Sequence, residues 1–216
     1  MLLTDGYLAN GSEPWIIPNP DDLGDFDAEF VKENLTDDQY LPYKRNKETL
    51  ARGWAIPGTK GLEHRIGGIE KQDVTGNVNY DSDNHEKMVQ LRAKKVANIA
   101  NELPPTEVFG KKKGDLLILS WGSTHGACRS ATESLLAENL KVAHVSIRWI
   151  SPLPNDLKDI LSNYKKVLMP EINTGQFRQM IRAEFLVDAI GLNEVQGKPL
   201  GTSTIVVKAK EIINER

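Results

Sequence analysis

Cysteine is almost absent from this sequence of 216 residues, since Cys128 is the only one. A single thiol excludes an intramolecular disulfide framework and is compatible with a reducing compartment. No apolar run approaches the roughly 20 residues that a membrane span requires, and the N-terminal residues lack the basic and apolar regions of an export signal. We therefore expect a soluble, cytoplasmic protein that contacts no membrane.

A surplus of basic residues is also missing, because the formal net charge is −3. No global positive field would draw such a chain onto DNA or RNA, so no nucleic-acid partner is predicted. The hydrophobic fraction of 39% lies below the roughly 45–50% usual for globular domains, although that benchmark also counts glycine. A hydrophobic core is therefore expected in only part of the chain.

The segment from residue 13 to residue 38 carries nine acids against one base, Lys32. It also contains prolines at positions 14, 18 and 20. Such a stretch buries too little apolar surface to fold alone. It is predicted to be a solvated connector or to lie across another surface.

A turn-rich region follows, from residue 53 to residue 80, and a helix is predicted after it. Asp83 and Glu86 have the spacing of a capping box, and apolar residues then recur at helical spacing until Pro104 and Pro105 end the helix. The bases of this helix are interpreted as a solvated face, because no Gly-rich loop adjoins them in sequence. They are Lys87, Arg92, Lys94 and Lys95.

Strands and helices alternate after Lys113. Strands are predicted at 115–120, 141–147 and 166–172, with a weak one at 194–196; helices are predicted at 123–139, 154–164 and 174–190, and a last segment follows at 203–216. This alternation predicts a small three-layer α/β domain, with a parallel sheet covered on both faces by helices.

Ligands of open parallel sheets gather at the carboxyl ends of the strands. At the first such end, Gly122, Ser123 and Thr124 are expected either to hold an anion at the helix start or only to cap their own helix. The nearby Cys128 and His125 suggest a nucleophile, but no third orienting group is apparent. A small buried helix residue is therefore the favoured interpretation of Cys128.

The next two strand ends supply further candidates. Arg148 and Trp149 precede two prolines in a rigid amphipathic corner suited to an interface. Glu171, Asn173 and Gln176 lie where a strand passes into a helix, and Asn173 or the adjacent threonine is predicted to be the N-cap of that helix.

The stretch GLEHRIGGIEKQDVTGNVNYDSDNHEKM, residues 61 to 88, contains His64 and His85 among several acids. Its spacing does not fit the EF-hand pattern, and the two histidines are 21 residues apart without a second paired ligand. No metal site is predicted here. The stretch is interpreted as a polar connector.

Several motifs taken together resemble a known family. The runs LLTDGYLANGSEPWIIP, GLEHRIGGIEKQDVTGNVNYDSDNHEKMVQLRAKKV, ILSWGSTHGACRSA, IRWISPLP and EINTGQ follow one another as they do at the C-terminal end of the alpha subunit of 2-oxoacid:ferredoxin oxidoreductases. The resemblance is closest to the 2-oxoglutarate type.

The resemblance implies three regions: residues 1–17 as the remnant of a preceding pyrimidine-type thiamine diphosphate domain, residues 18–105 as a connector ending in the helix, and residues 106–216 as a domain like the C-terminal domain of transketolase. The chain would then be a catalytically inert piece of a longer subunit. Its role would be assembly and shaping of the neighbouring active site. The contact residues expected on this basis are His64, Arg65, Ser123, Thr124, Arg148, Trp149, Glu171, Asn173 and Gln176.

The whole enzyme resembled would convert a 2-oxoacid into an acyl-CoA, using thiamine diphosphate, Mg²⁺, iron–sulfur clusters and coenzyme A. No cofactor is expected on this segment alone, since one cysteine cannot ligate a four-cysteine cluster. The implied partners are the rest of the alpha subunit, a beta subunit in a dimer of heterodimers, and ferredoxin. Two alternatives stay open: a stand-alone nucleotide- or CoA-binding module, and a hydrolase that uses Cys128.

Overall fold

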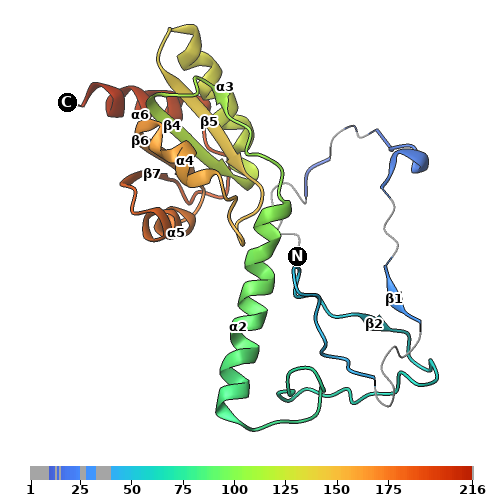
Figure 1. Ribbon diagram of the computed structural model, residues 1–216. Helices are drawn as coiled ribbons and strands as arrows, with labels where there is room; N and C mark the ends of the chain where they lie inside the picture. Colours follow the sequence, from blue (N-terminus) through green and yellow to red (C-terminus); the bar gives the residue numbers. More distant parts are fainter. Residues whose placement is uncertain (1–9, 13, 15, 25–27, 33–39, 216) are drawn as a thin grey trace. The chain divides into compact units, whose positions relative to one another are not determined.

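The computed structural model describes residues 10–12, 14, 16–24, 28–32 and 40–215 (Figure 1). Most of the predicted thiamine-domain remnant and part of the acidic segment lie outside the described residues. The chain forms two compact units, one spanning Trp15–Glu102 and the other centred on Leu103–Arg216. Among the described residues, no helix is long and apolar enough to cross a membrane.

The second unit contains the predicted α/β architecture. Its sheet has the order β3-β5-β4-β6-β7, from strands β3 (Phe109–Gly110), β4 (Gly114–Trp121), β5 (Val142–Ile147), β6 (Tyr164–Glu171) and β7 (Ala189–Asn193). Four of these strands are parallel, and only the short edge strand β3 is antiparallel to its neighbour. The predicted parallel sheet is therefore confirmed.

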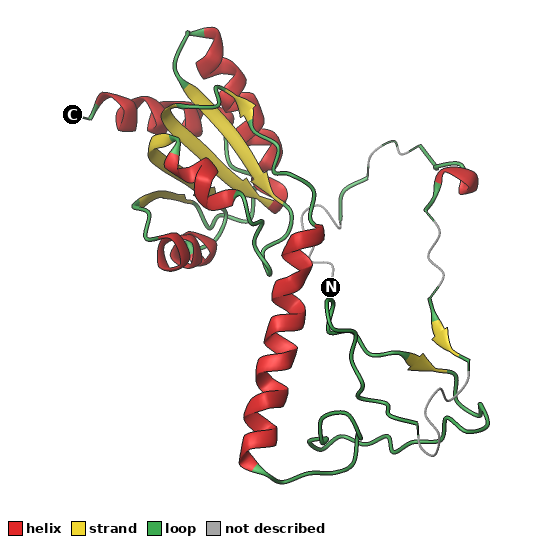
Figure 2. Cartoon of the chain, in the orientation of Figure 1, coloured by secondary structure: helices red, strands yellow, loops and turns green. Residues whose placement is uncertain are grey.

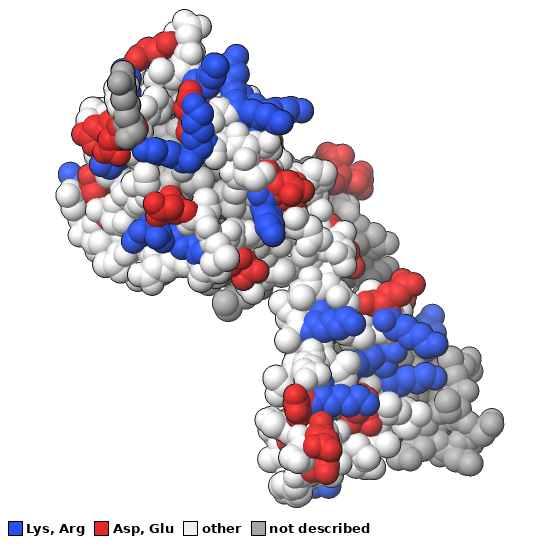
Figure 3. Space-filling view, turned by 60° about the vertical axis from the view of Figure 1, so that its left-hand side comes forward, with Lys and Arg blue, Asp and Glu red and all other residues white. Residues whose placement is uncertain are grey.

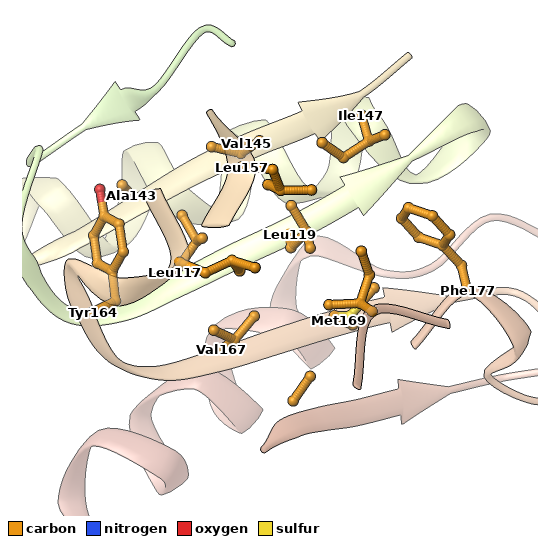
Figure 4. Close-up of a cluster of buried hydrophobic side chains, with 13 residues drawn as sticks. Leu117, Leu119, Ala143, Val145, Ile147, Leu157, Tyr164, Val167, Met169 and Phe177 are labelled. Carbon is orange, nitrogen blue, oxygen red and sulfur yellow. The ribbon is translucent and has the colours of Figure 1, made fainter. Parts of the chain in front are cut away.

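Helices cover both faces of this sheet (Figure 2). Residues of α3 (His125–Ala137) and α6 (Thr202–Asn214) pack on one face together with Leu116 and Ile118. Residues of α4 (Leu157–Ser162) and α5 (Gln176–Phe185) pack on the other face, against Leu117, Leu119 and Met169 (Figure 4). Consecutive side chains of β4 thus enter opposite cores, as expected for a central strand that is buried on both sides.

One predicted helix is too long and one predicted strand is misplaced. The helix expected at 174–190 ends at Phe185, where Leu186 adopts a left-handed conformation with φ of 52°. Residues Ala189–Asn193 then form β7, so the strand predicted at 194–196 lies several residues too far along the chain. Asp188 stands alone among Leu186, Val187, Ala189 and Ile190, so the apolar pattern continues and does not reveal this change from sequence.

The first unit has little regular structure apart from one long helix. It contains a short 3-10 turn η1 (Pro20–Asp22), a two-stranded parallel pair of β1 (Phe30–Val31) and β2 (Trp54–Ala55), the helix α2 (Ser82–Asn98) and a 3-10 extension η2 (Ile99–Glu102). Isolated antiparallel bridges tie its loops together, including Tyr43 with Val74. Residues 61 to 81, which the sequence predicts to be a polar connector, contain only turns, bends and isolated bridges before the start of α2.

A glycine fixes one close approach within this connector. Gly76 has φ of 74°, and a Cβ atom at this position would lie 2.7 Å from Cγ of Pro42 and 2.9 Å from the ring of Tyr43. A larger residue would be strained and would clash. This is the close backbone contact for which a glycine-rich connector is suited.

The start of α2 differs from the prediction. The N-cap is Asp81, whose carboxylate accepts a hydrogen bond of 2.9 Å from the backbone N–H of Asn84. Asp83 lies inside the first turn instead of capping it. Both aspartates are near the start of the apolar pattern, so spacing alone does not distinguish them.

The bases of α2 are only partly a solvated face. Lys87 pairs with Asp73 at 2.8 Å, and Arg92 pairs with Glu70 at 3.3 Å. Asn84 also bonds the connector, since it donates to the carbonyl of Lys71 and accepts from the N–H of Asp73. The connector therefore lies along α2. Gly67 and Gly68 of the connector line the same hollow as Arg92 and Lys95 of the helix, although these residues are distant in sequence.

Candidate functional site

The carboxyl ends of β4, β5 and β6 lie at one edge of the sheet, because the three strands are parallel neighbours. Seven of the nine predicted contact residues lie at these ends or within five residues after them: Ser123, Thr124, Arg148, Trp149, Glu171, Asn173 and Gln176. The structure therefore brings these seven to the same edge.

Glu171, the last residue of β6, is the best-defined member of this group. It is almost fully buried, with 1% of its surface exposed. Its carboxylate accepts hydrogen bonds from the indole N–H of Trp121 at 3.1 Å and from the backbone N–H groups of Phe177 at 3.2 Å and Arg178 at 3.1 Å. The carboxylate therefore occupies the N-terminus of α5, where a negative charge is favoured by the helix dipole.

This arrangement corrects the predicted N-cap. The N-cap residue of α5 is Gly175, with φ of 94°, and as a glycine it has no side chain to cap the helix. Asn173 instead accepts a hydrogen bond of 2.7 Å from the N–H of Gly175, and its own carbonyl accepts one from Asn193 in β7. The free N–H groups of the first turn are satisfied from a preceding strand, which local spacing does not reveal.

The first strand end is partly turned inward. Thr124 is buried, and its hydroxyl donates to the carbonyl of Trp121 at 2.9 Å. Gly122 has φ of 57°, and together with Ser123 and Thr124 it forms the 3-10 turn η3 (Gly122–Thr124) that leads into α3. Of the residues expected to hold an anion here, Thr124 thus uses its hydroxyl to bond the backbone of its own turn.

The remaining predicted residues of the edge are accessible. Arg148 and Trp149 follow β5, and 39% of the surface of Trp149 is exposed. Gln176 begins α5 and is exposed as well. These side chains are free to contact another part of a larger protein, whereas Glu171 is committed to internal contacts.

A buried polar cluster lies beneath α3 and had no clear sequence signal. Ser120 of β4 and His144 of β5 share a hydrogen bond of 2.7 Å, and the rings of His144 and His125 are 5.4 Å apart. Burial is the main cause that lowers the pKa of His144 from 6.5 to about 4, and electrostatic interaction with His125 and Arg129 acts in the same direction. His144 is therefore neutral at physiological pH.

Cys128 belongs to the same buried region. Burial raises the pKa of its thiol from 9.0 to about 12, against a smaller opposing effect of hydrogen bonds with Thr124 and Ser120. A nucleophilic cysteine needs an accessible thiolate, and this thiol is buried and protonated. The structure supports a packing role for Cys128 and contradicts the hydrolase alternative.

The two predicted contact residues of the connector lie in the other unit. His64 is exposed, and its Nδ1 atom lies 2.8 Å from the carbonyl oxygen of Leu62, while its ring meets that of Tyr40 edge-on at 5.2 Å. Arg65 is also exposed. His85, the second histidine of the stretch, pairs with Glu70 at 2.6 Å. No group of three potential metal-binding side chains occurs in the described part of the chain.

Two residues of the strand-end edge were missed from sequence. Trp121 holds Glu171 by its indole N–H and packs against Phe177 with ring centroids 5.7 Å apart. Arg178 lies over Gly191: a Cβ atom added to Gly191 would be 2.9 Å from the Nε atom of Arg178. Neither has a distinctive motif, since a tryptophan at a strand end and an arginine in a helix are ordinary in sequence.

Comparison with known proteins identifies the family. No family model matches the chain. It is 42% identical over 198 residues to the 2-oxoglutarate oxidoreductase subunit KorA of Mycobacterium tuberculosis, a match that covers 91% of this chain and 30% of that subunit. It is 32% identical over 113 residues to the alpha subunit of the 2-oxoacid:ferredoxin oxidoreductase of Saccharolobus solfataricus, covering 51% of this chain and 18% of the relative.

A solved structure agrees with these relatives. The 2-oxoglutarate:ferredoxin oxidoreductase of Magnetococcus marinus, with 2-oxoglutarate, coenzyme A and succinyl-CoA bound, matches 91% of this chain and 34% of its own with a TM-score of 0.81 and 32% identity. The chain thus spans about a third or less of the length of these relatives. It belongs to the family of 2-oxoacid:ferredoxin oxidoreductase alpha subunits, of which it matches the C-terminal part.

Proposed function

We propose that this chain acts as the C-terminal part of the alpha subunit of a 2-oxoglutarate:ferredoxin oxidoreductase. Such an enzyme decarboxylates 2-oxoglutarate, transfers the acyl group to coenzyme A and passes the electrons to ferredoxin. The observation that carries the proposal is the 42% identity over 198 residues to a 2-oxoglutarate oxidoreductase subunit. Fold likeness alone would not support it, because one α/β architecture serves many reactions.

Within that enzyme, the segment serves assembly and shaping of a neighbouring active site. Large apolar side chains of the connector unit are exposed, among them Tyr80 at 89%, Ile66 at 82% and Trp54 at 62%. Apolar surface of this kind is typical of contacts with another chain or domain. On this proposal, residues 1–17 end a preceding thiamine diphosphate domain, residues 18–105 connect, and residues 106–216 form the transketolase-like C-terminal domain.

The contact residues proposed are the accessible ones of both units. His64 and Arg65 belong to the connector, and Ser123, Arg148, Trp149, Asn173 and Gln176 belong to the strand-end edge. Thr124 and Glu171 act indirectly, because each is buried and bonded within its own unit. They hold the edge on which the other side chains are displayed.

Among the described residues, nothing provides the four-cysteine ligand set of an iron–sulfur cluster. The single thiol is buried and protonated, and no cluster of three metal-binding side chains occurs among the described residues. On this proposal, thiamine diphosphate, Mg²⁺ and the iron–sulfur cluster bind to the rest of the alpha subunit and to a beta subunit.

An enzyme assay of the purified 216-residue chain tests whether activity depends on the rest of the alpha subunit and on a beta subunit, as proposed. With 2-oxoglutarate, coenzyme A, thiamine diphosphate and oxidised ferredoxin, the chain is expected to reduce no ferredoxin. The complete Magnetococcus marinus enzyme is the positive control. Measurable CoA-dependent turnover by the isolated chain would overturn the assignment of catalysis to other parts.

A further inference from the structure

Basic side chains gather on the unit that contains α2 (Figure 3), and several of them line a hollow. The hollow has a volume of about 530 Å³, within the roughly 300–1,000 Å³ of small-molecule sites. It is formed by the connector, including Gly67 and Gly68, and by one face of α2. Its charged lining residues are Arg45, Arg52, Lys71, Arg92, Lys95 and Glu70.

Most of this positive charge is not neutralised by the described part of the chain. Glu70 pairs with His85 and with Arg92. The hydrogen bond with His85 is the main cause that lowers the pKa of the Glu70 carboxyl group, and the one with Arg92 acts in the same direction. Among the described residues, no carboxylate lies within ion-pair distance of Arg52, Lys71 or Lys95. Arg52 instead covers the ring of Tyr43, with its guanidinium carbon 4.1 Å from the ring centroid.

Lys71 is the strongest indication of a missing anion. It is 4% exposed, and its ammonium group donates to the backbone carbonyls of Gly67, at 2.9 Å, and Ile69. These two carbonyl oxygens accept hydrogen bonds from the Lys71 ammonium group but do not cancel its charge. A buried ammonium without a counter-charge is costly, and such groups are ordinarily paired with an anion.

Arg45 provides a second, independent indication. Its side chain is 10% exposed, and its Nε–H is buried without a hydrogen-bond partner. The closest carboxylate, that of Asp73, lies 3.8 Å from Nε and is engaged with Lys87 at 2.8 Å. The other guanidinium contacts are long: 3.5 Å to the carbonyl of Leu50 and 3.7 Å to the sulfur of Met88.

We propose that this hollow is a binding site for an oligophosphate group. Guanidinium forks and ammonium point charges together are suited to phosphate oxygens. The three cations that lack a carboxylate partner among the described residues favour a ligand with several negative charges over a single carboxylate. Gly67 and Gly68 bring the connector backbone close to the site without side chains that would fill it. The site lies wholly within one unit and is independent of the function proposed above.

Isothermal titration of the purified 216-residue chain with inorganic pyrophosphate tests this site. Saturable binding at one site is expected, weakening as potassium chloride is added. Orthophosphate should bind more weakly than pyrophosphate, and citrate, a tricarboxylate, should also bind more weakly. Absence of saturable binding, or tighter binding of citrate than of pyrophosphate, would overturn the proposal.

A matched pair of variants locates the binding. Lys95 lines the hollow, whereas Lys94, the preceding residue of α2, is also exposed but does not line it. Lys95→Gln should weaken pyrophosphate binding roughly three- to tenfold, because one charge-assisted contact is lost, while Lys94→Gln should change it less than about twofold. Equal weakening by both variants would show a diffuse charge effect and overturn the site. Both positions are exposed, so circular dichroism should show an unchanged fold.

Discussion

The indole N–H of Trp121 donates to the carboxylate of Glu171 over 3.1 Å, and so joins the ends of β4 and β6. The same carboxylate holds the first turn of α5 through two backbone N–H groups. Glu171, which the sequence predicts to be a contact residue, thus uses its carboxylate to hold together the strand-end edge of the sheet. The accessible side chains of that edge are placed by this internal network.

Glu171→Ala should lower the free energy of unfolding by about 3 kcal/mol or more, because three buried or half-buried donors lose their acceptor. Glu184→Ala is the control, since Glu184 is exposed on the same helix and should change stability by less than about 0.5 kcal/mol. Urea denaturation of both variants measures the difference. A loss below about 1 kcal/mol for Glu171→Ala would contradict the role given to this carboxylate.

Asp81→Ala should destabilise α2 by about 1 kcal/mol, the usual cost of removing an N-cap side chain. Asp83→Ala should cost only a few tenths of a kcal/mol, because Asp83 contributes charge near the helix start but caps nothing. Thermal or urea unfolding distinguishes the two. The reverse order of effects would restore the capping box predicted from the sequence.

Local periodicity predicts the elements of this chain well where one pattern dominates. The runs at 115–120 and 141–147 alternate or concentrate apolar residues, and they correspond to Gly114–Trp121 and Val142–Ile147. Prediction from local periodicity fails at Leu186. This residue adopts a left-handed conformation and ends α5, although the apolar pattern continues beyond it. That end is fixed by the following strand joining β6, which is a contact between distant segments.

Stability should fall as the pH is lowered from about 6.5 to about 4, because His144 is buried in its neutral form. Its folded pKa is depressed, so the unfolded chain binds more protons in this window and stability is lost as the pH falls through it. A shift from 6.5 to about 4 corresponds to at most about 3 kcal/mol.

The His144→Asn variant isolates this contribution from that of the carboxylates. Its unfolding free energy should depend less steeply on pH in the same window than that of the unaltered chain, whereas His64→Asn, at an exposed histidine, should keep the full dependence. Urea titrations at several pH values provide the comparison. Identical slopes for all three proteins would refute a neutral, buried His144.

Cys128 should react slowly with iodoacetamide in the native chain at about pH 8, since its thiol is buried and its pKa is raised to about 12. Unfolding in guanidinium chloride should restore the rate of an ordinary thiol. Mass spectrometry of timed samples measures both rates. Rapid labelling of the native chain would return Cys128 to the candidates for a nucleophile.

The site was only partly predictable for a physical reason. The order of strands along the chain places Ser123, Arg148 and Glu171 at one edge, and parallel topology is readable from the alternation of strands and helices. Which side chains turn inward depends on partners from other elements, as with Trp121 and Glu171. The hollow beside α2 was not foreseen, because its lining comes from three separate segments, at residues 43–52, 67–71 and 88–95.

Replacing the matching segment of Mycobacterium tuberculosis KorA by this chain tests the proposed function most directly. The 42% identity over 198 residues defines the segment to exchange, and KorA without the segment is the control. The chimera, assembled like the unaltered subunit, should retain CoA-dependent oxidation of 2-oxoglutarate that the control lacks. A chimera that assembles but is as inactive as the control would contradict the assignment of this chain to that role.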